Sequence, residues 1–345
     1  MSNKTEAAVL FKLNSNLKLV KLNLPEPSKN QVLVKIYFSS ICRSQLMEIY
    51  SGRKNKKWIP HMLGHEGVGK IIKLGTGVKN VKIGDIVVLT WISLSKRKSN
   101  SKFKFNDKYI NSGNVTTFSN YSIVSKFNVI KKPKHISNKL AVLLGCCIST
   151  GSGMVFNETN PKISSKIVLI GLGGVGLGIL LALKEKNINS VFIVEKDKKK
   201  IKIAKNLGYK NFTSGINHKD KKNILKFFKS KADICYESAG SVNTIEFGIS
   251  IVKSSGHIHF ASHPESFKKI KIFPHEIISG KKITGSWGGS CNPKLDFKIY
   301  AKFIVKNKKL LNKVFEKEYP LKNINTAIKK FKDNKIFRPI IKMQH

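Results

Sequence analysis

The sequence feature that most constrains this chain is a glycine-rich turn, Gly171-Leu172-Gly173-Gly174-Val175-Gly176, which fits the pattern G-x-G-x-x-G. An apolar strand pattern (165–170) precedes the turn and an apolar helix pattern (178–187) follows it. In such a turn the first glycine permits tight folding, the second lets backbone approach a pyrophosphate, and the third lets helix and strand pack closely. The helix N-terminus then faces the phosphates. This context predicts a dinucleotide-binding α/β fold.

An acidic residue at the end of the next strand strengthens this prediction. Glu195 ends the apolar run VFIVE, at the spacing from the turn that the motif requires. A carboxylate there accepts hydrogen bonds from the ribose hydroxyls and repels a 2′-phosphate, so we expect NAD rather than NADP as the cofactor. Lys196 follows directly and weakens that preference. Lys200, in the next predicted helix, is a further cofactor-binding candidate.

The patterning of the chain changes twice, which predicts three segments and two kinds of domain. Between 165 and 262, strands alternate with helices, and this order is typical of βαβ units in a parallel sheet. One of these helices is predicted over 244–256. Before 149, short strands separated by glycine-rich turns favour a β-barrel, and 92–115 resembles a loop excursion. The predicted segments are 1–148, 149–286 and 287–345.

The formal charge of +44 comes from 64 lysines and arginines against 20 acidic residues. Such a charge attracts nucleic acid or anionic membranes. Arginine, the preferred residue for phosphate and base contacts, is nearly absent, and the lysines are spread over the whole chain. We therefore do not expect a nucleic-acid partner. A non-catalytic nucleic-acid-binding protein on a retained dinucleotide fold is the alternative from another class.

Cysteine usage and hydropathy indicate a reduced, cytoplasmic protein without a membrane span. Five cysteines are too few and too unevenly placed for a disulfide scaffold. The N-terminus lacks the apolar core of a signal peptide. The longest apolar run (167–183) matches the shortest membrane spans in length, but its clustered glycines favour a strand, turn and helix.

Cys42, the pair His65-Glu66 and Cys146 stand out as candidate metal ligands. Two thiolates and an imidazole form a tetrahedral zinc set with one open position, which is the form of a catalytic zinc site. Spacing alone does not pair ligands that lie so far apart in the chain.

Four motifs together carry a resemblance to a known family. They are GHEGVG (64–69), VKIGDIVV (81–88), LLGCCISTG (143–151) and GLGGVG (171–176). In this order they resemble the medium-chain dehydrogenase/reductase superfamily, and within it the zinc-dependent alcohol dehydrogenases. The resemblance runs from about residue 7 to the C-terminus. It implies an α/β protein with a GroES-like β-barrel catalytic domain, made from both chain ends, and a Rossmann domain with a doubly wound parallel sheet between them.

The same resemblance assigns roles to individual residues. It implies that Cys42, His65 and Cys146 bind one catalytic zinc, and that Glu66 lies beside the metal and exchanges with water there. Ser44 matches the hydroxyl that takes the alcohol proton. Further matches concern the cofactor and the substrate pocket: Arg43 and Arg338 for the pyrophosphate, Thr150 and Val175 for the nicotinamide, and Trp91 for the pocket wall.

This chain departs from the family pattern at three places. Residues 92–115 contain no cysteine, so we expect no structural zinc. Met47 stands where many relatives have the histidine that ends the proton relay, so the relay passes through the cofactor ribose or another residue such as Glu48. Gln45 replaces the aspartate that orients the zinc histidine. An amide can accept the imidazole N–H but adds no negative charge.

The leading prediction is therefore a zinc- and NAD-dependent dehydrogenase that acts on an alcohol or its carbonyl. Within the same family, a polyol or sugar dehydrogenase and a glutathione-adduct dehydrogenase are the alternatives. The three intact ligand positions disfavour a zinc-free quinone-type reductase. We expect a small-molecule substrate and a homo-oligomer, either a dimer or a tetramer.

Overall fold

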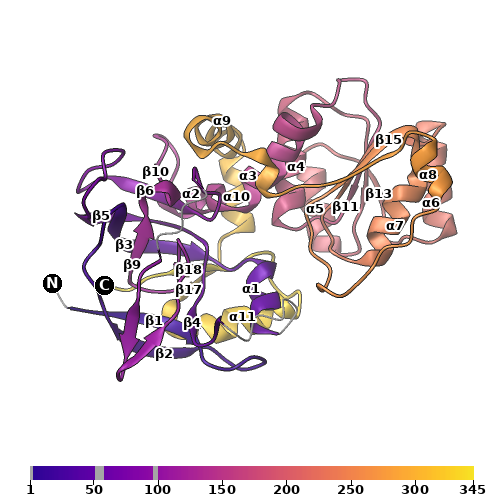
Figure 1. Cartoon of the computed structure of the whole chain (residues 1–345). Coiled ribbons are helices and arrows are strands. Elements are labelled where there is room, and N and C mark those ends of the chain that lie inside the picture. The colour runs from indigo at the N-terminus through magenta and orange to yellow at the C-terminus, as the bar shows by residue number, and fades with distance from the viewer. Residues whose placement is uncertain (1–2, 51–57, 96–99) are drawn as a thin grey trace. The chain divides into compact units, whose positions relative to one another are not determined.

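The structure is a computed structural model that describes residues 3–50, 58–95 and 100–345 (Figure 1). The chain divides into two compact units. The first unit combines Met1–Cys146 with Asn292–His345, and the second is Cys147–Cys291. The first unit is therefore built from both ends of the chain, and the second is a continuous insertion. Each unit is described by itself below.

The first unit is a near-closed, mainly antiparallel barrel. Its larger sheet has the strand order β10-β6-β5-β3-β18-β17, and β9 pairs with β3 beside this path. The central strand β3 is long and almost wholly buried, as its run of β-branched and aromatic residues predicts. The strands of this sheet are β3 (Gln31–Ser40), β5 (Glu66–Leu74), β6 (Ile86–Thr90), β9 (Tyr121–Ser125), β10 (Val129–Lys131), β17 (Glu318–Pro320) and β18 (Ile340–Lys342).

A second sheet of this unit has the strand order β4-β1-β2-β7-β8. It contains β1 (Lys4–Leu10), β2 (Lys18–Asn23), β4 (His61–Met62), β7 (Phe103–Phe105) and β8 (Lys108–Ile110). The expectation of an unpatterned loop over 92–115 was wrong in its second half, where β7 and β8 form a hairpin. Asn106 and Asp107 both have positive φ, at 44° and 59°, which suits a two-residue hairpin turn.

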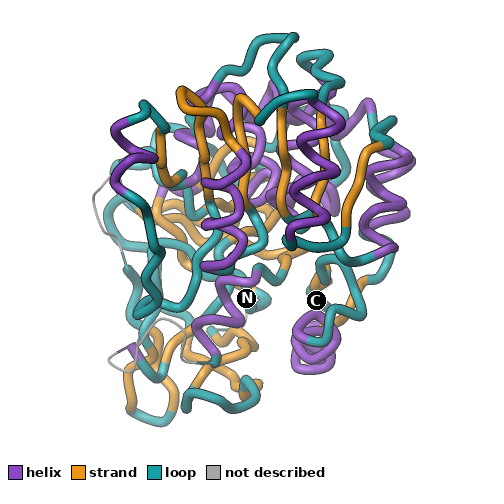
Figure 2. The backbone as a smooth tube through the Cα atoms, turned by 90° about the vertical axis from the view of Figure 1, so that its right-hand side faces the viewer, coloured by secondary structure: helices purple, strands orange, loops and turns teal. Residues whose placement is uncertain are grey.

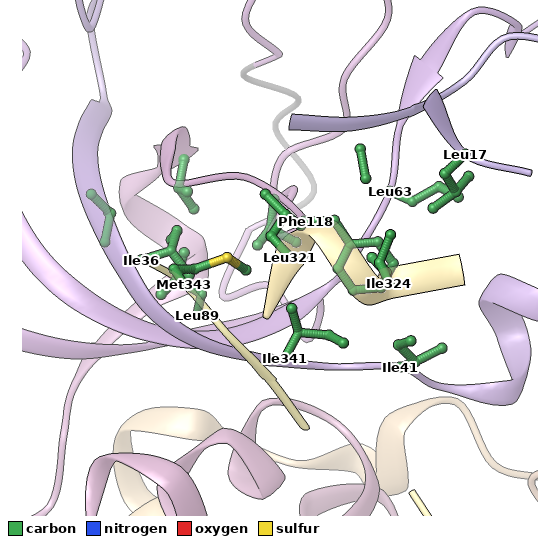
Figure 3. Close-up of a cluster of buried hydrophobic side chains, with 14 of the residues drawn as sticks. Leu17, Ile36, Ile41, Leu63, Leu89, Phe118, Leu321, Ile324, Ile341 and Met343 are labelled. Carbon is green, nitrogen blue, oxygen red and sulfur yellow. The ribbon is translucent and has the colours of Figure 1, made fainter. Parts of the chain in front are cut away.

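The hydrophobic core of the barrel joins segments from the two chain ends. Ile36, Ile41 and Leu89 from the first segment pack in one cluster with Leu321, Ile324 and Ile341 from the last (Figure 3). All six side chains are buried. Burial of this apolar surface ties the C-terminal segment to the barrel.

Helices of the first unit lie around the barrel and carry several candidate residues. They are α1 (Arg43–Ile49), α2 (Asn138–Ala141), the 3₁₀ turn η3 (Val142–Gly145), α9 (Pro293–Lys306), α10 (Lys308–Val314) and α11 (Ile324–Lys332). Helix α9 begins at Pro293, because Asn292 caps it and Pro293 suits its first position.

The second unit contains a six-stranded sheet in which every neighbouring pair is parallel. Its strand order is β13-β12-β11-β14-β15-β16. The strands are β11 (Ile167–Ile170), β12 (Val191–Val194), β13 (Asn211–Thr213), β14 (Ala232–Glu237), β15 (Val252–Phe260) and β16 (Lys282–Gly285). This doubly wound sheet and the barrel confirm the predicted fold class.

Helices connect these parallel strands and lie along them (Figure 2). The connecting helices are α4 (Gly174–Glu185), α5 (Lys198–Asn206), α6 (His218–Phe228), α7 (Val242–Ile251) and α8 (Pro274–Ile278). Helix α3 (Cys147–Gly153) and the π-helix η4 (Met154–Thr159) precede the first strand, β11. The predicted end of one helix at Gly256 was wrong, because α7 ends at Ile251 and the chain enters β15 at Val252.

Within residues 3–50, 58–95 and 100–345, no single helix is long and apolar enough to cross a membrane. Two consecutive shorter helices, Asn138–Gly145 and Cys147–Thr159, meet the test of length and composition only when taken together.

Candidate active site

Three metal-ligand side chains converge in the barrel unit. The ligand atoms of Cys42, His65 and Cys146 all lie within 4.8 Å of one another. Cys146 is buried, and the other two side chains are partly buried. Two thiols and an imidazole at this separation form a donor set that suits zinc, with a fourth tetrahedral position left open.

Cys42 holds its place through the first turn of α1, where it is the N-cap residue. The side-chain oxygen of Gln45 accepts a hydrogen bond from the Cys42 backbone N–H at 2.8 Å. The side-chain nitrogen of Gln45 lies 2.5 Å from Nδ1 of His65. One amide thus fixes two of the three ligand residues. The sequence analysis placed Gln45 beside His65 as an acceptor of the imidazole N–H, whereas here the amide nitrogen faces the ring.

His65 lies between β4 and β5, at a place where the backbone requires glycine. Gly64 has a φ of +87°, and a Cβ there would lie 2.4 Å from the Thr117 hydroxyl oxygen. The same threonine donates a hydrogen bond to the Glu66 carbonyl at 2.9 Å, and Ser39 donates a second one at the same distance. These contacts fix the backbone that presents His65. The sequence analysis did not find Ser39 or Thr117, which carry no motif signal.

Cys146 follows a glycine that packs tightly against two strands. A Cβ on Gly145 would lie 2.5 Å from the Leu89 carbonyl oxygen and 2.7 Å from the Glu66 Cβ. The Thr90 hydroxyl donates a hydrogen bond to the Gly145 carbonyl at 2.8 Å. Only glycine therefore lets the third ligand approach β5 and β6.

A buried ion pair joins the site to the C-terminal segment. Arg338 Nη2 donates to Glu66 Oε1, and both side chains are almost fully buried. Arg338 Nε donates to the Ser40 hydroxyl at 2.8 Å. Glu66 thus lies close enough to Cys42, His65 and Cys146 for its charge to act on all three. Arg338, the predicted pyrophosphate residue, has Glu66 and Ser40 as its partners within the barrel unit.

The proton affinities of the three ligands depend on one another. The hydrogen bond from Cys146, with the positive charges of Arg338 and His65, lowers the pKa of Cys42 well below its usual value. The same hydrogen bond and burial raise the pKa of Cys146 well above its usual value. Burial alone would lower the pKa of His65, but the adjacent Cys42 thiol and its negative charge, with the charges of Glu66 and Glu48, raise it. Zinc binding therefore has to displace protons from this cluster.

Two buried atoms without hydrogen-bond partners bear on whether a zinc ion fits between these residues. Nε2 of His65 and Oε2 of Glu66 are both buried and lack a partner among the described residues. Leaving a buried polar atom unsatisfied costs about 1–3 kcal/mol, so each atom calls for an interaction that the protein itself does not supply. Gln45 lies against Nδ1 of His65, so Nε2 is the nitrogen that can face a metal, once it carries no proton. The residues present fit a zinc ion.

The other predicted residues of the barrel unit lie around this cluster. Ser44 Oγ is 3.5 Å from His65 Nδ1. The Trp91 ring meets the His65 ring edge-on, with 6.4 Å between their centres. Arg43 is exposed, lies over the Phe331 ring, and donates to the Asn334 side chain. Ser44 and Trp91 are thus brought to the candidate metal ligands.

The glycine-rich turn of the second unit joins β11 to α4, as predicted. Gly171 has a φ of +86°, and a Cβ there would lie 2.7 Å from the Ala239 backbone nitrogen. A Cβ on Gly176 would lie 2.3 Å from the Gly171 carbonyl oxygen. A Cβ on Gly173 would meet nothing within 4 Å. The first and third glycines are therefore required by the fold itself, whereas the space at Gly173 is available to a ligand at the N-terminus of α4.

Glu195 directly follows β12. Its carboxylate links the glycine-rich turn to the backbone at the end of that strand. One of its oxygens accepts from the Leu172 N–H at 2.7 Å, and the other from the Asp197 N–H at 2.9 Å. Lys200 Nζ lies 3.8 Å from the carboxylate. These contacts place the two predicted cofactor residues beside the glycine-rich turn.

Thr150 and Val175, the predicted nicotinamide neighbours, lie on two helices that pack closely. Thr150 is in α3 and Val175 is in the first turn of α4. The helices approach so closely that a Cβ on Gly151 would lie 2.2 Å from the Val175 carbonyl oxygen. The second unit thus gathers its predicted cofactor residues around one end of α4.

Comparison with known proteins identifies the class of protein. Residues 28–134 match the alcohol dehydrogenase GroES-like domain, and residues 174–306 match the zinc-binding dehydrogenase domain. The chain belongs to the zinc-dependent alcohol dehydrogenase family of the medium-chain dehydrogenases, and it is an oxidoreductase of that type.

Individual relatives match over nearly the full length at low identity. The chain is 24% identical to an S-(hydroxymethyl)glutathione dehydrogenase of Synechocystis sp., covering 98% of this chain and 99% of that protein. It is 26% identical to alcohol dehydrogenase-like 3 of Arabidopsis thaliana, covering 98% and 96%. Its fold is similar to that of benzyl alcohol dehydrogenase from Acinetobacter calcoaceticus, with a TM-score of 0.89, 24% identity and 99% coverage of both chains.

Proposed function

We propose that this protein is a zinc- and NAD-dependent alcohol dehydrogenase, which transfers a hydride between an alcohol or carbonyl substrate and NAD(H). The observation that carries the proposal is the approach of Cys42, His65 and Cys146 to within 4.8 Å of one another. These residues come from three separate parts of the chain, and a soft donor set with an open position is typical of catalytic zinc.

In this proposal Cys42, His65 and Cys146 hold the metal. When bound, zinc supplies a Lewis acid that lowers the pKa of an alcohol, as it lowers that of water to about 7. Glu66 places negative charge beside the ligands, and its buried pair with Arg338 offsets that charge. Trp91, edge-on to His65, forms part of the wall that excludes water from the site.

Ser44 is proposed as the group that accepts the alcohol proton. Its hydroxyl lies next to the His65 ring, and it is partly exposed. Met47 cannot continue a proton relay. The proposed exits are the cofactor ribose and Glu48, whose charge, after those of Cys42 and Glu66, contributes to the raised pKa of His65.

The second unit is proposed to bind NAD. The N-terminus of α4 and the space at Gly173 receive the pyrophosphate, and Arg43 and Arg338 provide positive charge for it. Glu195 accepts hydrogen bonds from the ribose, beside Lys200. Thr150 and Val175 would position the nicotinamide ring, and the bound cofactor would supply the hydride chemistry.

A second candidate substrate is S-(hydroxymethyl)glutathione. Relatives at 24% and 25% identity over nearly the whole chain carry that activity in their names. The net charge of +44 favours an acidic substrate such as a glutathione adduct. A cytoplasmic homo-oligomer remains part of the proposal, and light scattering on the purified protein measures the oligomeric state.

The first test is zinc content, measured on protein purified without added zinc. We expect about one zinc per chain in the wild type, as a three-ligand site requires. Cys42→Ser and Cys146→Ser should lose it, and Cys291→Ser, a buried cysteine of the other unit, should keep it. Zinc that is absent from the wild type, or that persists in both ligand variants, contradicts the proposed site.

The second test is NADH formation with benzyl alcohol and with S-(hydroxymethyl)glutathione. Turnover of benzyl alcohol supports the leading proposal, and turnover of the glutathione adduct alone supports the second candidate. Zinc-loaded wild-type protein that oxidises neither of them, nor a panel of polyols, contradicts an alcohol dehydrogenase function.

A further inference from the structure

A groove of about 1000 Å³ runs along the barrel unit between α9 and the segment that follows β10. One wall is formed by residues 129–135 and the other by residues 293–306, with Asn80 at the edge. Cys42, His65 and Cys146 do not line it. It is therefore separate from the candidate metal site, and the proposed function assigns it no role.

The base of the groove is apolar. Val129 and Pro133 line one side, and Phe297, Ala301 and Val305 line the other. The last three follow one another at spacings of four residues and form an apolar row along α9, in which Phe297 and Ala301 are buried and Val305 is partly exposed. With 14 residues, α9 is about 21 Å long, which makes the groove long enough for an extended hydrocarbon chain.

Lysines line the rim of the groove. Lys294, Lys298, Lys302 and Lys306 follow one another along α9 at four-residue spacing, and all four line the groove. Like charges at this spacing repel each other, so the row costs helix stability. The residues that line the groove include no aspartate or glutamate among those the structure describes.

Two lysines of the opposite wall already have partners. Lys131 pairs with Asp85 at 3.0 Å, and Lys132 donates to the Ile136 carbonyl at 2.6 Å. By contrast, the structure gives no ion pair to Lys134, Lys298 or Lys302 within its described residues. Lysine side chains without an ion-pair partner therefore lie on both walls of the groove, with apolar residues between them.

We propose that this groove binds a single-chain anionic amphiphile, such as a fatty acid. The hydrocarbon chain lies along α9 over Val305 and the methylene stems of the lysines that line the groove, and the anionic head group pairs with Lys298, Lys302 and Lys134. Most of the binding free energy comes from apolar burial, as in other small-molecule sites, and the lysines select the sign of the charge.

Calorimetric titration with dodecanoate, kept below its micellar concentration, tests the proposal on the full-length protein. We expect saturable binding to the wild type. Lys298→Glu combined with Lys302→Glu should weaken it at least tenfold. The control, Lys308→Glu with Lys309→Glu, makes the same change in net charge on exposed lysines outside the groove and should leave binding unchanged. Val305→Asn, which removes apolar surface from the row along α9, should also weaken binding.

Several outcomes would overturn the proposal. The first is absence of dodecanoate binding. The second is an equal loss of affinity in the rim variant (Lys298→Glu with Lys302→Glu) and in the control variant. The third is binding of the cation dodecyltrimethylammonium with the same affinity as dodecanoate. Binding that survives the rim changes but is lost in Trp91→Ala would place the acyl chain at the candidate metal site. Binding only to phosphatidylglycerol vesicles would indicate a membrane surface. Circular dichroism checks that each variant is folded, and Lys298→Gln with Lys302→Gln replaces the rim variant if it is not.

Discussion

The side-chain nitrogen of Gln45 lies 2.5 Å from Nδ1 of His65, while the side-chain oxygen of Gln45 accepts the Cys42 backbone N–H at 2.8 Å. With the amide in this orientation its nitrogen donates, so Nδ1 has to accept, and a neutral ring then carries its proton on Nε2. A metal at Nε2 requires the opposite tautomer, with the proton on Nδ1. Zinc binding therefore requires the Gln45 amide group to flip, so that its oxygen faces Nδ1–H of His65. The amide nitrogen then faces the Cys42 backbone N–H, which places two hydrogen-bond donors opposite each other.

A carboxylate at position 45 would remove this conflict. In Gln45→Glu one oxygen accepts from Cys42 N–H and the other from His65 Nδ1–H, so both donors are satisfied in the zinc form. We expect zinc affinity to rise by about 10–100-fold, the usual size of such effects on a ligating histidine. Competition with a chelator measures it.

Gln344→Glu adds the same charge at an exposed position and serves as the control. It should leave the zinc affinity unchanged. A decrease in affinity in Gln45→Glu, or an equal increase in both variants, would show that the amide does not limit zinc binding.

Removing only one partner of the buried ion pair between Glu66 and Arg338 should strongly lower the free energy of unfolding. Glu66→Gln or Arg338→Met leaves an uncompensated charge or donor at a buried position, which costs about 3–5 kcal/mol. The double variant should cost less than the sum of the two, because neither partner is then left charged. Urea unfolding measures these differences. Lys73→Met, which breaks the exposed pair with Glu26, should cost at most about 1 kcal/mol.

Gly173→Ala separates cofactor binding from folding. Its Cβ would meet nothing within 4 Å, so we expect the free energy of unfolding to change by less than about 0.5 kcal/mol. The methyl group occupies the space that we assign to the pyrophosphate, so NAD affinity should fall at least tenfold. Gly171→Ala should instead destabilise the unit, because its Cβ would meet Ala239 at a φ of +86°. Unchanged NAD affinity in Gly173→Ala would contradict the assigned phosphate site.

Glu195→Gln should shift cofactor preference towards NADP. The substitution keeps the shape of the side chain but removes the charge that repels a 2′-phosphate, and it leaves Lys200 without its anionic neighbour. We expect the ratio of kcat/KM for NADP to that for NAD to rise by about tenfold or more, since one lost charge interaction changes binding by about 1.4 kcal/mol. Glu265→Gln, an exposed acid of the same unit, should leave the ratio unchanged.

His257 should make the second unit sensitive to acid. Burial, with the charges of His259 and Lys282, lowers the pKa of His257 from 6.5 to about 4. Between these pH values the unfolded chain binds one more proton than the folded chain, so stability falls as the pH falls from about 7 to 4. Because the ring is only partly buried, we expect a loss of about 1 kcal/mol from this group.

Urea unfolding at pH 7 and pH 4.5 measures this dependence. His257→Gln should lose less stability between the two pH values than the wild type does. His135→Gln changes an exposed histidine of the other unit and should behave like the wild type. Identical pH dependence in wild type and His257→Gln would contradict the assignment.

Elements whose signals are local could be predicted from the sequence. The turn at Gly171 and the strand ending at Glu195 depend on neighbouring residues in one βαβ unit, and their positions agree with the structure. The hairpin of β7 and β8 was missed because its short strands carry mixed polar and apolar residues. The end of α7 was misplaced because the sheet extends β15 back to Val252, against the local pattern.

The sequence by itself determined the kind of donor atoms, the two fold types and the cofactor motif, because these depend on residue chemistry and short-range periodicity. Only the tertiary structure decided that Arg338 pairs with Glu66, 272 residues away, and that the Gln45 nitrogen faces His65. It also brought the lysines of α9 opposite Lys134. Such contacts follow from how the whole barrel packs its two chain ends together, and no local pattern encodes them.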